Sequence, residues 1–198
     1  DTLSLHDALP ISLVDRLLAP HRKAHVIEAF NVHEALERVR SLVLAEFPKG
    51  LRIIRNYDTS LPDVMGDREQ LIQAVLNIVH NAAQALSDEI SQGIAQIELK
   101  TRVARSVTIA KHRYKLAMDL HVIDNGPGIP ETEYSKVFDR LYRLDATRQT
   151  PGLGLGLSLV QAVTTLHQGS ISLRDASTNH ADNQRGLCVS VLLPMHTL

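Results

Sequence analysis

The sequence predicts an α/β fold, in which β-strands and amphipathic helices follow one another along the chain. Residues 116–123 alternate between apolar and polar side chains, as a strand buried on one face does. Residues 67–86 instead carry apolar side chains at steps of three and four, which is typical of an amphipathic helix. The chain has 198 residues, enough for one domain of typical size and a short extension.

The composition excludes several classes of protein. Hydrophobic residues make up 44% and charged residues 22%, as in an ordinary soluble globular protein, and the net charge of -1 gives no footprint for nucleic acid or an anionic membrane. A single cysteine, Cys188, rules out a disulfide framework and fits a reducing, cytoplasmic setting. No apolar run is long enough to span a bilayer, and the ten histidines lack zinc-site spacing.

The start of the chain does not read as the start of a folded domain. Residues 1–12 are interpreted as a non-native leader, and residues 13–20 look like the last turns of an amphipathic helix that stops before Pro20. We therefore expect the folded domain to span residues 23–196.

The same periodicities predict the remaining elements. Strands are expected at residues 26–32, 51–57, 94–103, 116–123, 170–175 and 187–193. Helices are expected at 33–47, at 67–86 and from Gly156 to a cap at Gly169. Residues 104–113 read as a polar hairpin or bulge. Residues 130–151 read as a long charged connection, anchored by Val137 and Phe138, of the kind that covers a ligand.

Neutral amide side chains gather on one face of the helix at 67–86. Asp67 is the expected N-cap, with Gln70 as its capping-box partner. Asn77 and Asn81 lie one turn apart and point the same way, so an amide oxygen could bind Mg²⁺ there. Solvent faces usually carry Lys, Glu and Arg instead, although a plain solvent face remains the alternative.

Asp124 ends the strand at 116–123 and begins the stretch Asp-Asn-Gly-Pro-Gly-Ile-Pro. Gly126 and Gly128 have no Cβ, so a flat ligand can lie against the backbone. Asp124 then offers an acceptor suited to an exocyclic amine such as that of adenine. The alternative is an ordinary tight turn.

Three alternate glycines, Gly152, Gly154 and Gly156, lead directly into a helix. A glycine-rich entry to a helix leaves backbone N–H groups that can hold a polyphosphate. Arg143 and Arg148 in the preceding connection could also meet phosphate oxygens, whereas Arg140 is expected at the surface. A flexible loop is the alternative, and neither a Walker lysine nor a Rossmann pattern is present.

Taken together, these patterns resemble the ATP-binding domain of sensor histidine kinases, within the wider group of gyrase-type topoisomerases and Hsp90-like chaperones. The resemblance covers roughly residues 13–194 and implies a two-layer sandwich of a mixed β-sheet packed on helices, with ATP under a lid. The matching stretches are 77–82 (asparagine box), 124–130 (first glycine box), 137–143 (phenylalanine box), 152–157 (second glycine box) and 186–194 (closing strand).

The resemblance also implies roles for individual residues. Asn81 would hold Mg²⁺, Asn77 would be the catalytic residue at the phosphates, and Asp124 would accept from the adenine amino group. ATPase members of the wider group carry a general-base glutamate where Asn77 stands, so transfer to a protein is expected rather than hydrolysis. The other expected ATP-binding residues are Gly126, Gly128, Ile129, Arg143, Arg148, Gly152, Gly154, Leu155, Gly156 and Leu157.

The front half is most similar to the nitrogen-regulation type of sensor kinase, and residues 13–22 would be the remnant of the last dimerisation-hairpin helix. The resemblance places the phosphoacceptor histidine upstream of residue 13, since His6 has the wrong spacing to its proline. The implied partners are the histidine-bearing hairpin and a downstream response regulator. From Val137 onward the lid is more similar to membrane-sensor kinases of another subfamily, and Leu153 stands where the family often has a small hydroxyl residue. These two features leave open a nucleotide-binding regulatory module without phosphotransfer. A third alternative is an anti-sigma-type serine kinase, which shares the fold.

Overall fold

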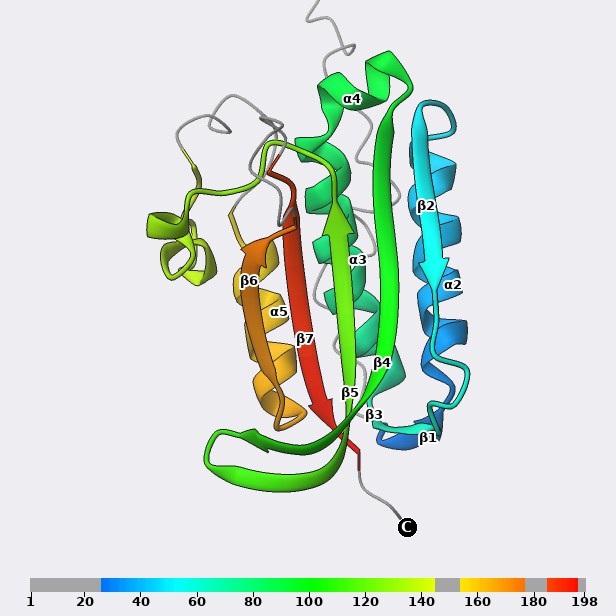
Figure 1. Cartoon of the computed structure of the whole chain (residues 1–198), viewed down its shortest axis with the longest axis vertical. Coiled ribbons are helices and arrows are strands. Elements are labelled where there is room, and N and C mark those ends of the chain that lie inside the picture. The colour runs from blue at the N-terminus through cyan, green and yellow to red at the C-terminus, as the bar shows by residue number, and fades with distance from the viewer. Residues whose placement is uncertain (1–25, 145–153, 177–184, 196–198) are drawn as a thin grey trace, which may run out of the picture.

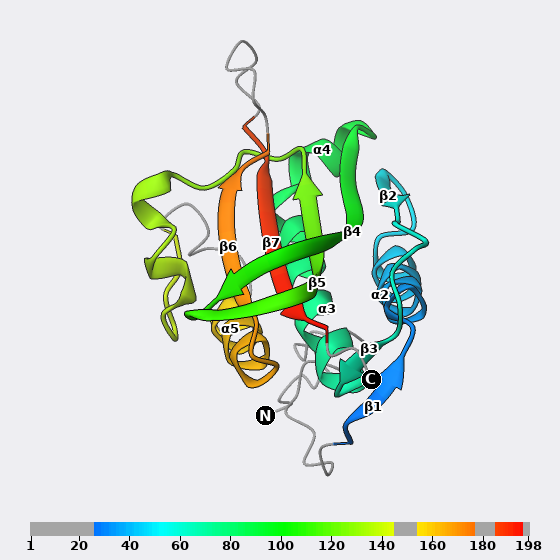
Figure 2. The same ribbon diagram turned by 60° about the horizontal axis from the view of Figure 1, so that its bottom comes forward.

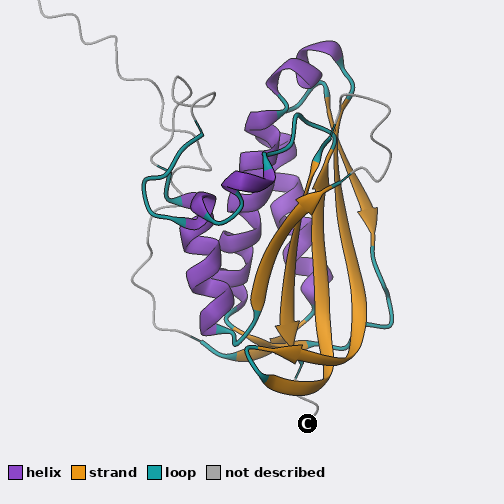
Figure 3. Ribbon diagram, turned by 60° about the vertical axis from the view of Figure 1, so that its left-hand side comes forward, coloured by secondary structure: helices purple, strands orange, loops and turns teal. Residues whose placement is uncertain are grey.

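The computed structural model describes residues 26–144, 154–176 and 185–195, which form two layers. One layer is a five-stranded sheet, and the other consists of helices packed on one face of that sheet (Figure 3). The predicted α/β sandwich is therefore confirmed, whereas the helix expected at 13–20 lies outside the described residues. The strands of the sheet are β2 (Leu51–Asn56), β4 (Ala95–Ile109), β5 (His112–Asp124), β6 (Ser170–Asp175) and β7 (Leu187–Pro194).

The helical layer consists of three main helices (Figure 1). They are α2 (Val32–Glu46), α3 (Arg68–Ala85) and α5 (Gly156–Leu166), with the short helix α4 (Ser87–Gln92) directly after α3. None of the described helices has the length and apolar character that a bilayer crossing requires.

The main sheet is mixed, as expected. Its strand order is β2-β4-β5-β7-β6, with β2 and β4 parallel and every other pair antiparallel. Asp124, the last residue of β5, lies opposite Ile97 of β4, and its neighbour Ile123 lies opposite Cys188 of β7. A second sheet pairs β1 (Glu28–Phe30) with β3 (Val64–Gly66). The sequence analysis did not predict β3 or α4.

The core lies between the sheet and α3. Along β5, alternate residues such as Met118, Leu120 and Val122 are buried beneath the helices, because successive side chains of a strand point to opposite faces. Helix α3 is buried on more than the one apolar face predicted from the sequence, since α2 and α5 flank it. Leu76 and Val79 are therefore buried as well.

The start of α3 is capped in a way that joins it to the end of α5. Oδ1 of Asp67 accepts a hydrogen bond from the Gln70 N–H at 3.1 Å, which confirms the N-cap. The predicted reciprocal bond of a capping box, from the Asp67 N–H to the Gln70 side chain, is wrong, because the Asp67 N–H donates to Nε2 of His167 at 3.0 Å instead. Nδ1 of the same imidazole donates to the Val163 carbonyl at 2.8 Å. This histidine thus links the two helices.

The backbone decides two other predictions. The region predicted as a polar hairpin or bulge, residues 104–113, is a hairpin, in which the end of β4 and the start of β5 join through the two residues Ala110 and Lys111. At the end of α5, Gln168 rather than Gly169 adopts positive φ (57°). Gly169 is needed for space instead, because a Cβ there would lie 2.5 Å from the Leu192 carbonyl oxygen.

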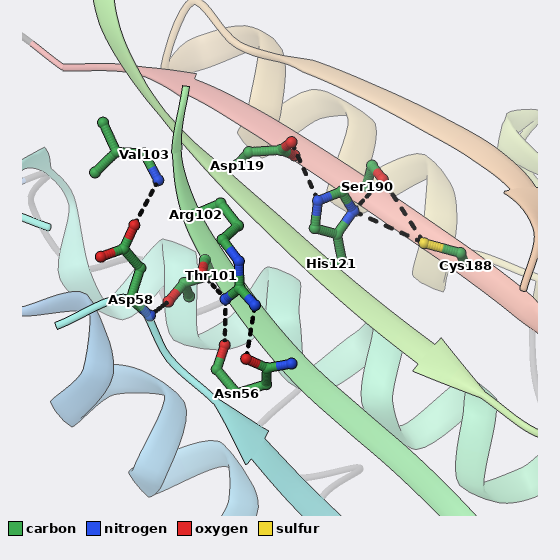
Figure 4. A network of polar contacts seen from close by, with 9 residues as sticks. All are labelled: Asn56, Asp58, Thr101, Arg102, Val103, Asp119, His121, Cys188 and Ser190. Carbon is green, nitrogen blue, oxygen red and sulfur yellow. Dashed lines mark hydrogen bonds and ion pairs between the residues drawn. The ribbon is translucent and has the colours of Figure 1, made fainter. Parts of the chain in front are cut away.

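The outer face of the sheet, opposite the helices, carries a network of polar side chains (Figure 4). Nε2 of His121 lies 3.1 Å from Oδ2 of Asp119, and Nδ1 lies 2.6 Å from Oγ of Ser190 on the neighbouring strand. The Asp119 carboxylate, aided by the Cys188 sulfur and opposed by burial, raises the pKa of His121 to about 9. The imidazole is therefore charged at neutral pH and joins β5 to β7.

Candidate functional site

The described residues of the predicted site lie in one half of the molecule. The second half of α3, the end of β5 and the start of α5 lie in the upper half of the view in Figure 1, below α4. A helix N-terminus and a strand end thus share this edge of the sandwich.

Helix α5 begins directly against the amide groups of α3. A Cβ placed on Gly156 would lie 3.1 Å from Nδ2 of Asn81 and 3.4 Å from Oδ1 of Asn77. Nδ2 of Asn77 donates to the Gln73 carbonyl at 3.1 Å, which turns its oxygen toward α5. Asn77 is 4% exposed, whereas Asn81 is exposed. The alternative of a plain solvent face is therefore wrong for Asn77.

Asp124 is held at the end of β5 by two backbone donors. Its Oδ1 accepts from the Gly126 N–H at 2.9 Å and from the Leu187 N–H at 3.2 Å. The side chain is 7% exposed, and this burial raises the pKa of Asp124. The two backbone bonds oppose that shift, and the negative charge of Glu89 adds to it. The carboxyl group is thus fixed in one orientation, with Oδ2 not used by these donors.

The loop after Asp124 and the chain before β7 approach each other so closely that glycine is required. The Gly186 N–H donates to the Gly126 carbonyl at 2.8 Å, and a Cβ on Gly186 would overlap the Asp124 carbonyl group. Gly128 has φ +71°, which an L residue rarely adopts. From the sequence, Gly186 was assigned only to the closing strand. Its place beside Asp124 follows from the pairing of β5 with β7, which no local pattern shows.

The connection after β5 folds into two short 3₁₀ helices, η1 (Glu131–Glu133) and η2 (Lys136–Phe138). The Tyr134 hydroxyl donates to Oδ1 of Asp175 on β6 at 2.9 Å, and the Tyr142 hydroxyl donates to the Glu133 carboxylate. Val137 is buried, as expected for an anchor. These contacts fix the root of the connection to the edge of the sheet.

The described residues on either side of 145–153 lie together. The Leu141 N–H donates to the Gly154 carbonyl at 3.0 Å, and a Cβ on Gly154 would lie 3.1 Å from Cγ of Arg143. Leu155 is 43% exposed, whereas Leu157 packs against the core. Ile129 is half-buried in the loop after Gly128. Arg148 and Gly152 lie outside the described residues.

Among the described candidate site residues, only Asp124 and Arg143 carry a charge. Among the described residues, no group of three or more histidine, cysteine, aspartate or glutamate side chains could hold a metal ion. Amide oxygens such as that of Asn81 fit Mg²⁺, which keeps several waters and binds mainly through substrate phosphates. The donor set therefore suits a metal that arrives with a nucleotide, rather than one held by a protein cage.

Residues 66–197 match the family described as histidine kinase-, DNA gyrase B-, and HSP90-like ATPase, which covers more than half of the chain. The chain belongs to this family. Family membership and the observed sandwich confirm the resemblance seen in the sequence.

Sensor kinases are among the similar family members. The sensory histidine kinase/phosphatase NtrB of Salmonella typhimurium is 43% identical over 161 residues, which are 81% of this chain and 43% of that protein. NtrB of Vibrio alginolyticus is 40% identical over 162 residues, or 82% of this chain and 44% of that protein. The predicted similarity to nitrogen-regulation kinases is confirmed. The chain spans less than half the length of these relatives.

Solved structures of the family share the fold. The mycobacterial sensor histidine kinase MprB superimposes with a TM-score of 0.71 and 26% identity, covering 86% of this chain and 100% of that one. The catalytic domain of histidine kinase ThkA gives a TM-score of 0.66 at 21% identity, covering 86% of this chain and 96% of that one.

Proposed function

We propose that this chain is the ATP-binding catalytic domain of a two-component sensor histidine kinase. It binds Mg²⁺-ATP and transfers the γ-phosphoryl group to a histidine on a dimerisation hairpin, which then supplies a response regulator, in a cytoplasmic setting. Family membership and the similarity to NtrB support this proposal. The observation that carries it is the close approach of Gly156 to the amides of Asn77 and Asn81, because a helix N-terminus that could hold phosphates would then lie beside an amide oxygen that could bind Mg²⁺.

The N-terminus of α5 would hold the phosphates. Its first backbone N–H groups lack partners within the helix, and the helix dipole favours negative charge there. Residues 152–157 would follow the phosphates with their backbone, and Arg143 and Arg148 would contact phosphate oxygens. Asn81 would hold Mg²⁺, whose charge neutralises the phosphates during transfer.

Asp124 would read the adenine base. Oδ1 is occupied by the Gly126 and Leu187 N–H groups, so we assign Oδ2 to the exocyclic amine. Gly126, Gly128 and Ile129 would form the surface against which the ring lies. A carboxyl oxygen fixed as an acceptor favours an amine at this place and disfavours a carbonyl oxygen.

Asn77 would favour transfer over hydrolysis. Its amide cannot accept a proton from water, so no general base activates water beside the γ-phosphate. It would instead act as the catalytic residue that positions the phosphates, with its oxygen turned toward α5. A histidine imidazole, itself a nucleophile, needs no such base.

A transfer assay tests this function. The chain is mixed with a separately produced histidine hairpin from an NtrB relative and ATP labelled in the γ-phosphate. Acid-labile label on the hairpin is the expected result. Acid-stable label would indicate a serine kinase, and nucleotide binding without transfer would indicate a regulatory module.

A further inference from the structure

The β4–β5 hairpin extends beyond the sheet as a two-stranded ribbon. Pairing of β2 with β4 ends at Asn56 and Lys100, and pairing of β5 with β7 ends at Ala117 and Pro194. Among the described residues, those at 104–116 therefore have only each other as strand partners, and they bend toward the end of α5 (Figures 1 and 2). We name residues 104–116 the arm.

The arm carries positive charge only. It contains four Lys and Arg residues and no Asp or Glu, whereas the whole chain has a net charge of -1, so the remainder carries -5. All four cations are exposed, and none takes part in an ion pair between described residues. They are Arg105, Lys111, Arg113 and Lys115.

The arm has one rooted face and one open face. Ile109 is 2% exposed, and the Tyr114 hydroxyl donates to Oε1 of Gln168 at 3.4 Å, so this face packs back on the domain. Arg113 and Lys115 belong to the other face, where Arg113 lies opposite the small residue Thr108. Alternate residues of a strand are about 7 Å apart on one face. The open face thus presents two neighbouring cations from a fixed base, with Lys111 at the tip of the arm and Arg105 on the rooted side, opposite Leu116.

The tip of the arm is strained. Ala110 and Lys111 have φ of 46° and 72°, as in the type I′ turn that joins two strands most directly. Asn-Gly suits that turn far better, because L residues with a Cβ are disfavoured at positive φ. A lysine held in such a conformation is not explained by folding, and strain of this kind concentrates at functional segments.

We propose that the arm is a docking site for an acidic surface of a partner protein. Exposed cations on a rigid hairpin attract a surface of opposite charge. Two arms would repel one another, because their charges have the same sign, so the acidic surface must lie outside the arm. Nucleic acid fits less well, since it needs a wider basic footprint and the rest of the chain is negatively charged.

Binding of a labelled oligoglutamate peptide, followed by fluorescence anisotropy at low and physiological salt, tests the proposal. The wild-type chain should bind it in a salt-dependent manner. The double variant Arg113→Glu/Lys115→Glu should lose at least about tenfold in affinity. The matched control is Lys49→Glu/Arg52→Glu, which makes the same change of net charge at exposed cations outside the arm and should bind like wild type.

A turn variant separates stability from docking. Ala110→Asn/Lys111→Gly should raise the melting temperature, because the turn loses its strain, yet weaken peptide binding, because it loses the cation at the tip. Equal losses in the arm and control variants would overturn the proposal. So would the absence of peptide binding, or tighter binding to a DNA duplex of equal charge or to phosphatidylserine vesicles.

Discussion

Gly156 lies directly against Asn81, so that a Cβ added to the glycine would fall 3.1 Å from Nδ2 of the asparagine. The first residue of one helix therefore sits on the proposed metal-binding side chain of another. This packing leaves no room for a side chain between the backbone of α5 and the amide. Any ligand that binds both the N-terminus of α5 and the Asn81 amide must therefore approach from the solvent side, as a Mg²⁺-nucleotide would.

Substitution Gly156→Ala should weaken nucleotide binding without destabilising the fold. Alanine is a better helix former than glycine, by about 1 kcal/mol, and no positive φ opposes it at this position. Its Cβ would displace the end of the Asn81 side chain. We expect Mg²⁺-ATP affinity, measured by calorimetry, to fall while the melting temperature is kept. Unchanged affinity would remove this contact from the proposed site.

Substitution Asn81→Ala should remove the metal-dependent part of nucleotide affinity. Wild type should bind ATP more weakly when EDTA removes Mg²⁺, whereas the variant should bind equally with and without the metal. Gln84→Ala, at another exposed amide one turn further along the same helix, is the matched control and should retain the Mg²⁺ effect. A Mg²⁺ effect of normal size in Asn81→Ala would assign the metal to other ligands.

The hydrophobic periodicity of the sequence predicted the long helices and strands, because each of them buries one face. Helix α3 was expected to end at about residue 86 and ends at Ala85, and β5 ends on Asp124 as expected. The short β3 and α4 were missed, because three to six residues carry too little periodicity. The hairpin predicted at 104–113 is present, although the polar pattern there did not show that both of its strands continue β4 and β5.

The candidate site was predicted as a set of residues, but its packing was not. The burial of Asn77 depends on α5, which comes about 80 residues later, so no local pattern shows it. The same holds for Leu187, whose N–H binds Asp124, and for His167, which replaces Gln70 at the Asp67 N–H. The local sequence predicts helix caps and the apolar faces of helices. The hydrogen-bond partners named above are instead decided by tertiary packing.

The contact between Asp119 and His121 should make stability depend on pH. The folded-state pKa of His121 is about 9, above its ordinary value of 6.5. The charged His121 therefore contributes its full stabilisation when the pH is below the ordinary pKa of 6.5. This contribution is lost as the pH rises through the folded-state pKa of about 9. In urea unfolding, Asp119→Asn should cost on the order of 1–2 kcal/mol at about pH 6 and much less at about pH 9.5. An equal cost at both pH values would contradict this account.

Substitution Gly169→Ala should destabilise the fold without a specific effect on the nucleotide. The added Cβ would lie 2.5 Å from both the Leu192 carbonyl oxygen and Cδ2 of Leu193, and the backbone oxygen cannot move aside cheaply. We expect a loss of about 1–3 kcal/mol in the free energy of unfolding. The folded fraction should still bind ATP normally. A stability equal to that of wild type would show that α5 and β7 can separate here.

Calorimetry with Mg²⁺-ATP on Asp124→Asn tests the central claim most directly. Asparagine keeps an oxygen for the Gly126 and Leu187 N–H groups, but it replaces Oδ2 by a donor that cannot pair with the adenine amine. Stability should hold or rise, because a buried carboxylate is removed. We predict that wild type binds and that the folded variant binds at least about tenfold more weakly, a loss of about 1.4 kcal/mol or more. Equal affinity for ATP in a folded Asp124→Asn variant would contradict the account.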